Sequence, residues 1–179
     1  MKYLFNTKRL GFRGWSLEDR IPFAKINGDN QVMRHFPKTL SSSESDDLYN
    51  KISSHFHEHG YGLYAVDLLQ TGRFIGFIGF QHTTFQADFT PCVEIGWRLT
   101  PHFWNNGLAT EGAKKCLEFG FLEFGFTDVF SFTAKRNKPS EKVMQKIGMN
   151  FLGEFDHPLV EAHSPLHKHV LYHISSNAI

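Results

Sequence analysis

One segment of the sequence places a carboxylate next to a loop that could hold a phosphate group. Glu94 lies in an apolar, strand-like stretch, and the small-residue loop at 105–109 opens directly into the pattern of a long amphipathic helix. The first turn of a helix leaves backbone N–H groups without intrahelical partners, and the helix dipole adds partial positive charge there. Gly107 lets a ligand approach that backbone closely, so the segment predicts a phosphate cradle that needs no Lys or Arg.

A second motif, Asn137 followed by Ser140, stands at the start of another predicted helix. Asn and Ser at this place are usually helix caps, and capping alone is enough to explain Ser140. The phosphate loop is also a weak signal by itself. It lacks the three-glycine spacing of a dinucleotide-binding fold and the Gly-Lys-Ser/Thr of a P-loop. The pairing of the two motifs carries more weight than either one.

Composition and charge describe an ordinary globular protein. A length of 179 residues suits one domain with a sizeable core, and without a linker we expect a single domain over residues 1–179. The net charge of +1 offers no electrostatic basis for binding nucleic acid or an anionic membrane. The chain lacks both an apolar segment that could span a bilayer and the apolar run of a signal peptide, so we expect a cytoplasmic protein.

The cysteines and histidines predict neither a disulfide nor a metal site. Cys116 falls on the apolar face of a predicted helix and Cys92 starts a strand, where a nucleophilic role is not expected. His55 and His59 have the spacing of a metal pair, but the sequence indicates no third ligand. A solvated helix face is therefore favoured, and we expect no metal.

Hydrophobic periodicity predicts the elements that would position these motifs. Strands are expected at residues 10–13, 62–69, 73–81, 92–99, 129–134, 151–155 and 169–174. Helices are expected at residues 17–27, with Leu17, Ile21 and Ala24 on one apolar face, and at 30–35, 48–59, 108–124 and 139–147. An antiparallel meander followed by β-α-β-α-β predicts a mixed α/β fold, with a central twisted sheet and helices on both faces.

Three motifs together resemble the GNAT superfamily of acyl-CoA-dependent N-acyltransferases, and within it the branch of ribosomal-protein N-terminal acetyltransferases. The motifs are Glu94-Ile95-Gly96-Trp97-Arg98-Leu99, Trp104-Asn105-Asn106-Gly107-Leu108-Ala109-Thr110-Glu111, and Asn137-x-x-Ser140 leading to Lys146-Ile147-Gly148-Met149. The likeness extends from about Arg9 to His173. It implies one domain whose mostly antiparallel sheet is splayed between two strands, and the transfer of an acetyl group from acetyl-CoA to a primary amine by direct attack.

The resemblance also implies a role for each motif. The strand of Glu94 would bulge and splay from the strand at 129–134, and the pantetheine arm would pair with backbone groups of Trp97 and Leu99. Asn137 would hold that arm by its side-chain amide, and Ser140 would face the thioester sulfur. The pyrophosphate would bind backbone N–H groups of Asn105, Asn106, Gly107, Leu108, Ala109 and Thr110.

The chain departs from the family pattern at three positions. Trp104 replaces a polar residue at the start of the phosphate loop, and Ala109 replaces its last glycine. Met144 stands where many members have the Tyr that protonates the departing thiolate, which leaves Ser140 as a hydrogen-bonding substitute. Glu94 is the candidate general base, and its alternative role is to accept backbone N–H groups at the bulge.

The acceptor stays open at this stage. A peptide N-terminus, a polyamine, an aminoglycoside and a small metabolite are all compatible with the chain, whose helices at 14–61 and loop at 81–91 would shape the acceptor site, with His157 at its border. The acidic stretch at 41–47 could line a site for a cationic amine, although a capped helix start explains it better. Another acyl-CoA, a non-catalytic CoA sensor or partner subunit, and a homodimer through exposed sheet edges are the remaining alternatives.

Overall fold

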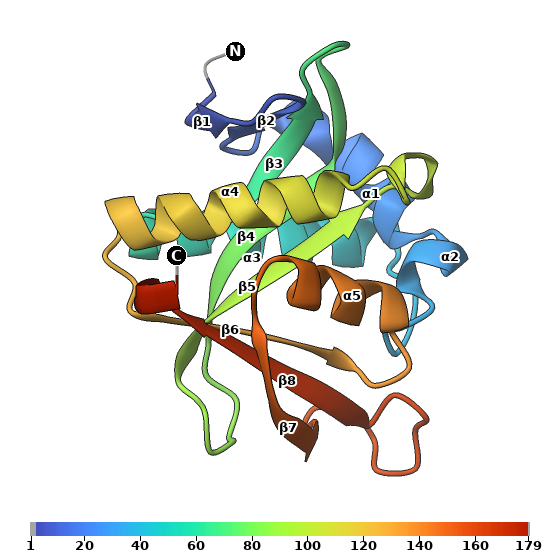
Figure 1. Cartoon of the computed structure of the whole chain (residues 1–179). Coiled ribbons are helices and arrows are strands. Elements are labelled where there is room, and N and C mark those ends of the chain that lie inside the picture. Colours follow the sequence, from blue (N-terminus) through green and yellow to red (C-terminus); the bar gives the residue numbers. More distant parts are fainter. Residues whose placement is uncertain (1–2, 179) are drawn as a thin grey trace.

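The strands follow one another across a single sheet in chain order, except for the last two. The computed structural model describes residues 3–178, and its sheet has the order β1-β2-β3-β4-β5-β6-β8-β7 (Figure 1). All neighbours are antiparallel except β5 and β6, which are parallel. The strands are β1 (Phe5–Asn6), β2 (Leu10–Arg13), β3 (Leu63–Leu68), β4 (Arg73–Thr83), β5 (Cys92–Leu99), β6 (Asp128–Ala134), β7 (Asn150–Asp156) and β8 (Lys168–Ser175).

Helices cover both faces of this sheet, as predicted. In Figure 1, α4 and α5 lie in front of the strands, and α3 lies behind them. Two apolar clusters fill the space on the two sides: one contains Ile78, Phe80 and Leu117, and the other contains Phe23, Ile52 and Phe77. The helices are α1 (Arg20–Asn27), α2 (Asn30–Met33), α3 (Ser42–His59), α4 (Leu108–Glu123) and α5 (Lys138–Lys146).

Two glycines let α4 lie directly on the sheet. A Cβ built on Gly112 would stand 2.4 Å from Ile78 Cδ1, and one on Gly120 would stand 2.7 Å from Phe80 Cζ. Cys116, on the same face of the helix, is fully buried, as expected. This close packing fixes the axis of α4 and therefore the position of its N-terminus, beside the end of β5.

The parallel pair β5–β6 touches at one point and then separates. Its single paired position is Glu94 with Phe130, and just beyond it Ser131 Oγ donates a hydrogen bond of 2.9 Å to the carbonyl oxygen of Ile95. The predicted splay is therefore confirmed. The predicted bulge is wrong, because β5 pairs with β4 without a register shift along all eight of its residues.

Two helix predictions need correction. Leu17 and Ile21 do not face the core: they are 73% and 71% exposed, because Leu17–Asp19 is a separate 3₁₀ turn and α1 buries Phe23 and Ile26 instead. The helix expected at residues 30–35 ends at Met33. Within residues 3–178, the structure has no helix that combines the length and the apolar character needed to cross a bilayer.

The acidic stretch at 41–47 starts α3, as favoured above. Ser41 Oγ accepts from the backbone N–H of Glu44, and the Glu44 carboxylate accepts from the backbone N–H of Ser41. This is a capping box. Gly60, with φ of +74°, ends the helix.

A buried ion-pair network ties the N-terminal strands to the turn before α1. Arg13 donates two hydrogen bonds of 2.7–2.8 Å to each of two carboxylates, those of Asp19 and Asp67. Burial alone would lower the pKa of Arg13, but the hydrogen bonds to the two aspartates outweigh it and raise that pKa. All three side chains are at most 6% exposed, so each buried charge is stabilised by its ion-pair partners and not by water.

Removing the cation of this network should destabilise the fold strongly. Arg13→Met leaves two buried carboxylates without their partner, and we expect the free energy of unfolding to fall by about 3–5 kcal/mol. Urea denaturation followed by circular dichroism measures the loss. Lys115→Met is the matched control: it breaks the exposed pair with Glu118 and should cost less than about 1 kcal/mol. Equal losses in the two variants would contradict the assigned role.

Candidate active site

A cavity of about 1230 Å³ opens where β5 and β6 part. It is bounded by the start of α4, by α5, and by the segment between α2 and α3. All of the predicted site residues except Asn106 line it, namely Glu94, Trp97, Leu99, Asn105, Gly107, Leu108, Ala109, Thr110, Asn137 and Ser140. The fold therefore gathers residues from three distant motifs around one space large enough for a cofactor and a second ligand.

The predicted phosphate loop has the backbone of an anion-binding turn. Asn105 and Gly107 both have positive φ, 60° and 73°, and α4 begins at the next residue, Leu108. Arg9 fixes this turn from the N-terminal strands: its guanidinium donates to the carbonyl oxygen of Asn106 at 2.9 Å and pairs with Glu111 at 2.6 Å. The loop is thus held in shape by groups other than those that would face a phosphate.

Asn106 is the one predicted cofactor contact that does not line the cavity. Its backbone carbonyl faces Arg9, and its side-chain amide donates back to the carbonyl oxygen of Trp104 at 2.9 Å. The residue is exposed. Its side chain closes the turn, while a contact between its backbone N–H and the pyrophosphate stays a prediction.

Trp104 has a structural task in place of the polar residue expected at this position. Its indole Nε1 donates a hydrogen bond of 2.7 Å to the carbonyl oxygen of Leu99, and the Arg34 guanidinium lies over its ring at 5.6 Å. The loop is therefore tied to the end of β5. One of the backbone groups expected to pair with pantetheine already accepts a hydrogen bond, although a carbonyl oxygen can accept a second.

Glu94 is a buried carboxylate with two side-chain donors. Gln81 Nε2 and Thr83 Oγ1, both on β4, donate to Glu94 Oε2 at 2.7 and 2.8 Å. Burial raises the pKa of Glu94 to about 7, and these two hydrogen bonds hold it below the value that burial alone would give. The alternative in which Glu94 accepts backbone N–H groups at a bulge is wrong, because its donors are side chains and the bulge is absent.

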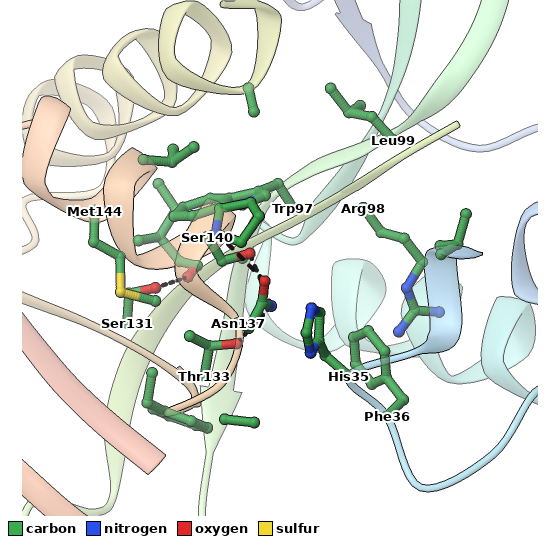
Figure 2. A pocket seen from close by; sticks show the side chains of 18 of the residues that line it. His35, Phe36, Trp97, Arg98, Leu99, Ser131, Thr133, Asn137, Ser140 and Met144 are labelled. Atoms are coloured by element: carbon green, nitrogen blue, oxygen red, sulfur yellow. Dashed lines mark hydrogen bonds between the residues drawn. The ribbon is translucent and has the colours of Figure 1, made fainter. Parts of the chain in front are cut away.

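Asn137 positions Ser140 at the start of α5. Its side-chain Oδ1 accepts from the Ser140 N–H at 3.4 Å, while its Nδ2 donates to Ser140 Oγ at 3.0 Å and to Thr133 Oγ1 at 2.9 Å (Figure 2). Both amide hydrogens are used inside this turn. Because Ser140 Oγ accepts one of them, its own hydroxyl hydrogen is left to donate toward the cavity.

No tyrosine replaces Met144 in the described lining. Met144 is 1% exposed and lines the cavity together with Ser131, and both are labelled in Figure 2. Cys92 is also buried, and burial raises the pKa of its thiol to about 12, which makes a thiolate nucleophile unfavourable near neutral pH.

The histidines are placed by hydrogen bonds and packing. His55 is only partly exposed: Nδ1 contacts the carbonyl oxygen of Tyr61 at 3.0 Å and Nε2 accepts from the His82 N–H at 2.9 Å, so a solvated helix face is wrong for this residue. His157 does border the cavity, and burial with neighbouring His169 lowers its pKa to about 4. Within the part of the chain that the structure describes, no group of three or more potential ligands is arranged for a metal.

Three residues of the site were not singled out from the sequence. Gln81 and Thr83 reach Glu94 because of the register in which β4 pairs with β5. An irregular loop joins the two strands, so this register could not be predicted from the sequence. Arg98 lies on the same strand face as Glu94, as the alternation of side chains along a strand predicts for residues four positions apart. Its surroundings were not visible, because they come from α1 and the α2–α3 segment.

Comparisons with known proteins agree on one family. A family model described as acetyltransferase (GNAT) domain matches residues 9–150. The protein named "Uncharacterized N-acetyltransferase YnaD" of Bacillus subtilis is 31% identical over 150 residues, which cover 83% of this chain and 84% of that protein.

Two solved structures share the fold. Spermidine N-acetyltransferase from Vibrio cholerae, in complex with CoA and spermine, has a TM-score of 0.74 at 16% identity, with 96% of this chain and 98% of that chain covered. Ribosomal-protein-S5-alanine acetyltransferase from Vibrio fischeri has a TM-score of 0.73 at 16% identity, with 98% of each chain covered. Such low identity shows the fold alone, so the closeness to the ribosomal-protein branch is not confirmed.

Removing the hydroxyl of Thr83 should raise the pKa of Glu94 further. Thr83→Val deletes a donor to the charged form, and we expect the pKa to rise by about one unit above its present value near 7. Carbon-detected NMR titration of the glutamate carboxyls measures it. Thr71→Val, in the β3–β4 turn, is the control and should leave the titration of Glu94 unchanged. A lower pKa in Thr83→Val would contradict the hydrogen-bond assignment.

Proposed function

Because the chain belongs to the GNAT family of acetyltransferases, we propose that it moves an acetyl group from acetyl-CoA to a primary amine by direct attack of the amine. The chain is an acyl-CoA-dependent acetyltransferase. The observation that carries the proposal is one cavity that joins a carboxylate of pKa about 7 to a positive-φ loop at a helix start. The first suits an ammonium that must lose a proton, and the second suits a pyrophosphate.

The chain's own residues fit coenzyme A along the splayed strands. The backbone N–H groups at the start of α4 would hold the pyrophosphate, and Trp97 and Leu99 would line the path of the pantetheine arm. The shape of the loop is maintained by Arg9 and Asn106, so the N–H groups need no rearrangement before binding. This preorganisation supports the assignment of coenzyme A as the group that the loop recognises.

Glu94 is proposed as the general base. A carboxylate with a pKa near 7 is ionised often enough at neutral pH to accept a proton, and basic enough to take it from an ammonium directly or through a water molecule. Gln81 and Thr83 hold the carboxylate by one oxygen, Oε2. In the described residues, Oε1 accepts no side-chain hydrogen bond, which leaves it for the amine.

Ser140 is proposed to stabilise the departing thiolate by a hydrogen bond. Asn137 donates to Ser140 Oγ and so directs the hydroxyl hydrogen away from the turn. A serine hydroxyl is too weak an acid to protonate a thiolate fully near neutral pH, and a hydrogen bond in a water-poor site is the contribution open to it. We assign Asn137 to positioning Ser140 rather than to holding the pantetheine arm, because both its amide hydrogens are engaged.

The acceptor, the extent of the domain, the location and the oligomeric state are also proposals. They are a peptide or small-molecule amine as acceptor, one functional domain over residues 1–179, a cytoplasmic location and a homodimer. A catalytically weak CoA sensor is the second candidate, and it is supported by Met144 in place of the usual tyrosine. Tight CoA binding without CoA release on any of a broad panel of amines would favour that second candidate over the enzyme.

Replacing Glu94 by glutamine should lower the rate and remove the part of its pH dependence that comes from Glu94. In the wild type, kcat/KM should rise as the pH increases through about 7, because Glu94 must be deprotonated to accept the proton. Glu94→Gln should lower kcat by about 10²- to 10⁴-fold and abolish this limb, while the limb that belongs to the amine itself remains. CoA release followed over pH 5.5–9.5 measures both. An unchanged profile would remove Glu94 as the base.

A side chain at Gly107 should weaken CoA binding. An L-residue at φ of +73° costs about 1–2 kcal/mol, so Gly107→Ala should turn the loop away from its present shape and raise the Kd for CoA roughly tenfold. Calorimetry measures that affinity. Gly125→Ala is the matched control: its φ is +64°, but it lies after α4, away from the cavity. Equal CoA affinities in the two variants would contradict the proposed cradle.

A further inference from the structure

The geometry of Arg98 points to an acceptor that carries a carboxylate as well as its amino group. This inference rests on the proposed function, because it assigns the acceptor end of the same cavity. We propose that Arg98 binds the carboxylate while Glu94 receives the proton of the amine. The acceptor class is therefore a short peptide with a free carboxyl terminus or an amino acid with a spacer, and not a polyamine.

Arg98 is a cation without a counter-ion among the described residues. Its Nη1 donates to Asn27 Oδ1 at 2.6 Å, and its guanidinium lies over the rings of Phe36 at 4.3 Å and Phe77 at 5.4 Å. Its Nε is buried without a hydrogen-bond partner, in the residues that the structure covers. Burial lowers the pKa of Arg98 to about 10, which still leaves it charged at neutral pH.

A held guanidinium with unused donors suits a carboxylate. The amide and the two rings fix its plane. Nη2 has no hydrogen-bond partner among the described residues and, unlike Nε, is not among the fully buried atoms, so it can donate a charge-assisted hydrogen bond to a carboxylate in the cavity. An unpaired buried charge is costly for a fold and is more common at a binding site than in a purely structural position.

Arg98 and Glu94 face the same open groove. Residues 94, 96 and 98 share one face of β5, and the middle one is Gly96, where an added Cβ would meet nothing within 4 Å. Figure 2 shows Trp97 and Arg98 leaving the strand in opposite directions, with Arg98 turned toward Phe36. The Cα atoms of Glu94 and Arg98 are about 13 Å apart along the strand, which leaves room for a spacer between an amine and a carboxylate.

The charges around the cavity oppose a polycation. Glu94 is the only carboxylate among the described lining residues. The cations of the lining are Arg34, Arg98, Lys138, Lys142 and Lys146. The three lysines lie on α5, the helix that opens with Asn137, whereas Arg34 and Arg98 lie on the side of Phe36. A polyamine would therefore bring several ammonium groups toward two guanidiniums with one carboxylate to meet them, while a carboxylate would reduce that repulsion.

Binding of matched ligand pairs to the CoA-loaded protein tests this inference. The probes are triglycine and aminohexanoate, each against its carboxamide, with spermidine as the polycation, all measured by calorimetry at pH 8. We expect at least one of the carboxylates to bind about 10- to 100-fold more tightly than its carboxamide, the range expected for charge-assisted hydrogen bonds to a guanidinium. Spermidine should bind more weakly than that carboxylate.

Three variants locate the preference. Arg98→Gln should bind carboxylate and carboxamide equally, and Arg98→Lys should keep part of the difference. Lys114→Gln, which removes a charge from the exposed face of α4, should keep all of it. Melting temperatures check that each variant folds. If Arg98→Gln does not fold, the difference in affinity between carboxylate and carboxamide in the wild type still tests the inference.

Two results would overturn the inference: equal affinities for each carboxylate and its carboxamide in the wild type, or a preference that survives in Arg98→Gln. These outcomes are distinguishable from failure of the proposed function. If acetyl-CoA were never consumed with any amine but the carboxylate preference held, the acetyl transfer would be wrong while the carboxylate site stood.

Discussion

The site depends on the early separation of β5 from β6. Two parallel strands usually stay paired along their length, but here one paired position and the Ser131–Ile95 hydrogen bond are followed by divergence. The remaining backbone of β5 is held on its other side by continuous pairing with β4. One edge of β5 is thereby kept rigid and open, and its two faces point into different parts of the cavity.

In the proposed enzyme, the two faces of β5 would contact two different ligands. Trp97 and Leu99 pack toward the cluster under α4, near the loop assigned to the cofactor. Glu94 and Arg98 face β4 side chains and the α2–α3 segment, where the acceptor would bind. If the proposed sites are right, side-chain alternation along β5 would place cofactor and acceptor on opposite faces, and the amine and the thioester would meet at the splay.

Features set by neighbouring residues can be predicted from this sequence. Features set by contacts between residues far apart in the chain cannot. The loop before Leu108 and the strand of Glu94 were recognised because helix starts and strand alternation are local. Leu17 was misassigned, since periodicity cannot reveal that the Ser16–Asp19 box ends one turn and a new helix follows. The surroundings of Arg98 were invisible, because Asn27 lies 71 positions away in the chain and only packing of α1 brings it there.

The contacts of Thr7 and Arg9 with the start of α4 and the loop before it have a consequence for the amino end of the chain. Arg9 contacts the carbonyl of a residue 97 positions later, and Thr7 donates to Glu111 on the first turn of α4. These contacts link the conformation of the first hairpin to that of the turn before α4. If the turn binds coenzyme A as proposed, truncations or fusions that disrupt the contacts of Thr7 and Arg9 would lower the affinity for the coenzyme, although these residues lie far from the turn in the sequence.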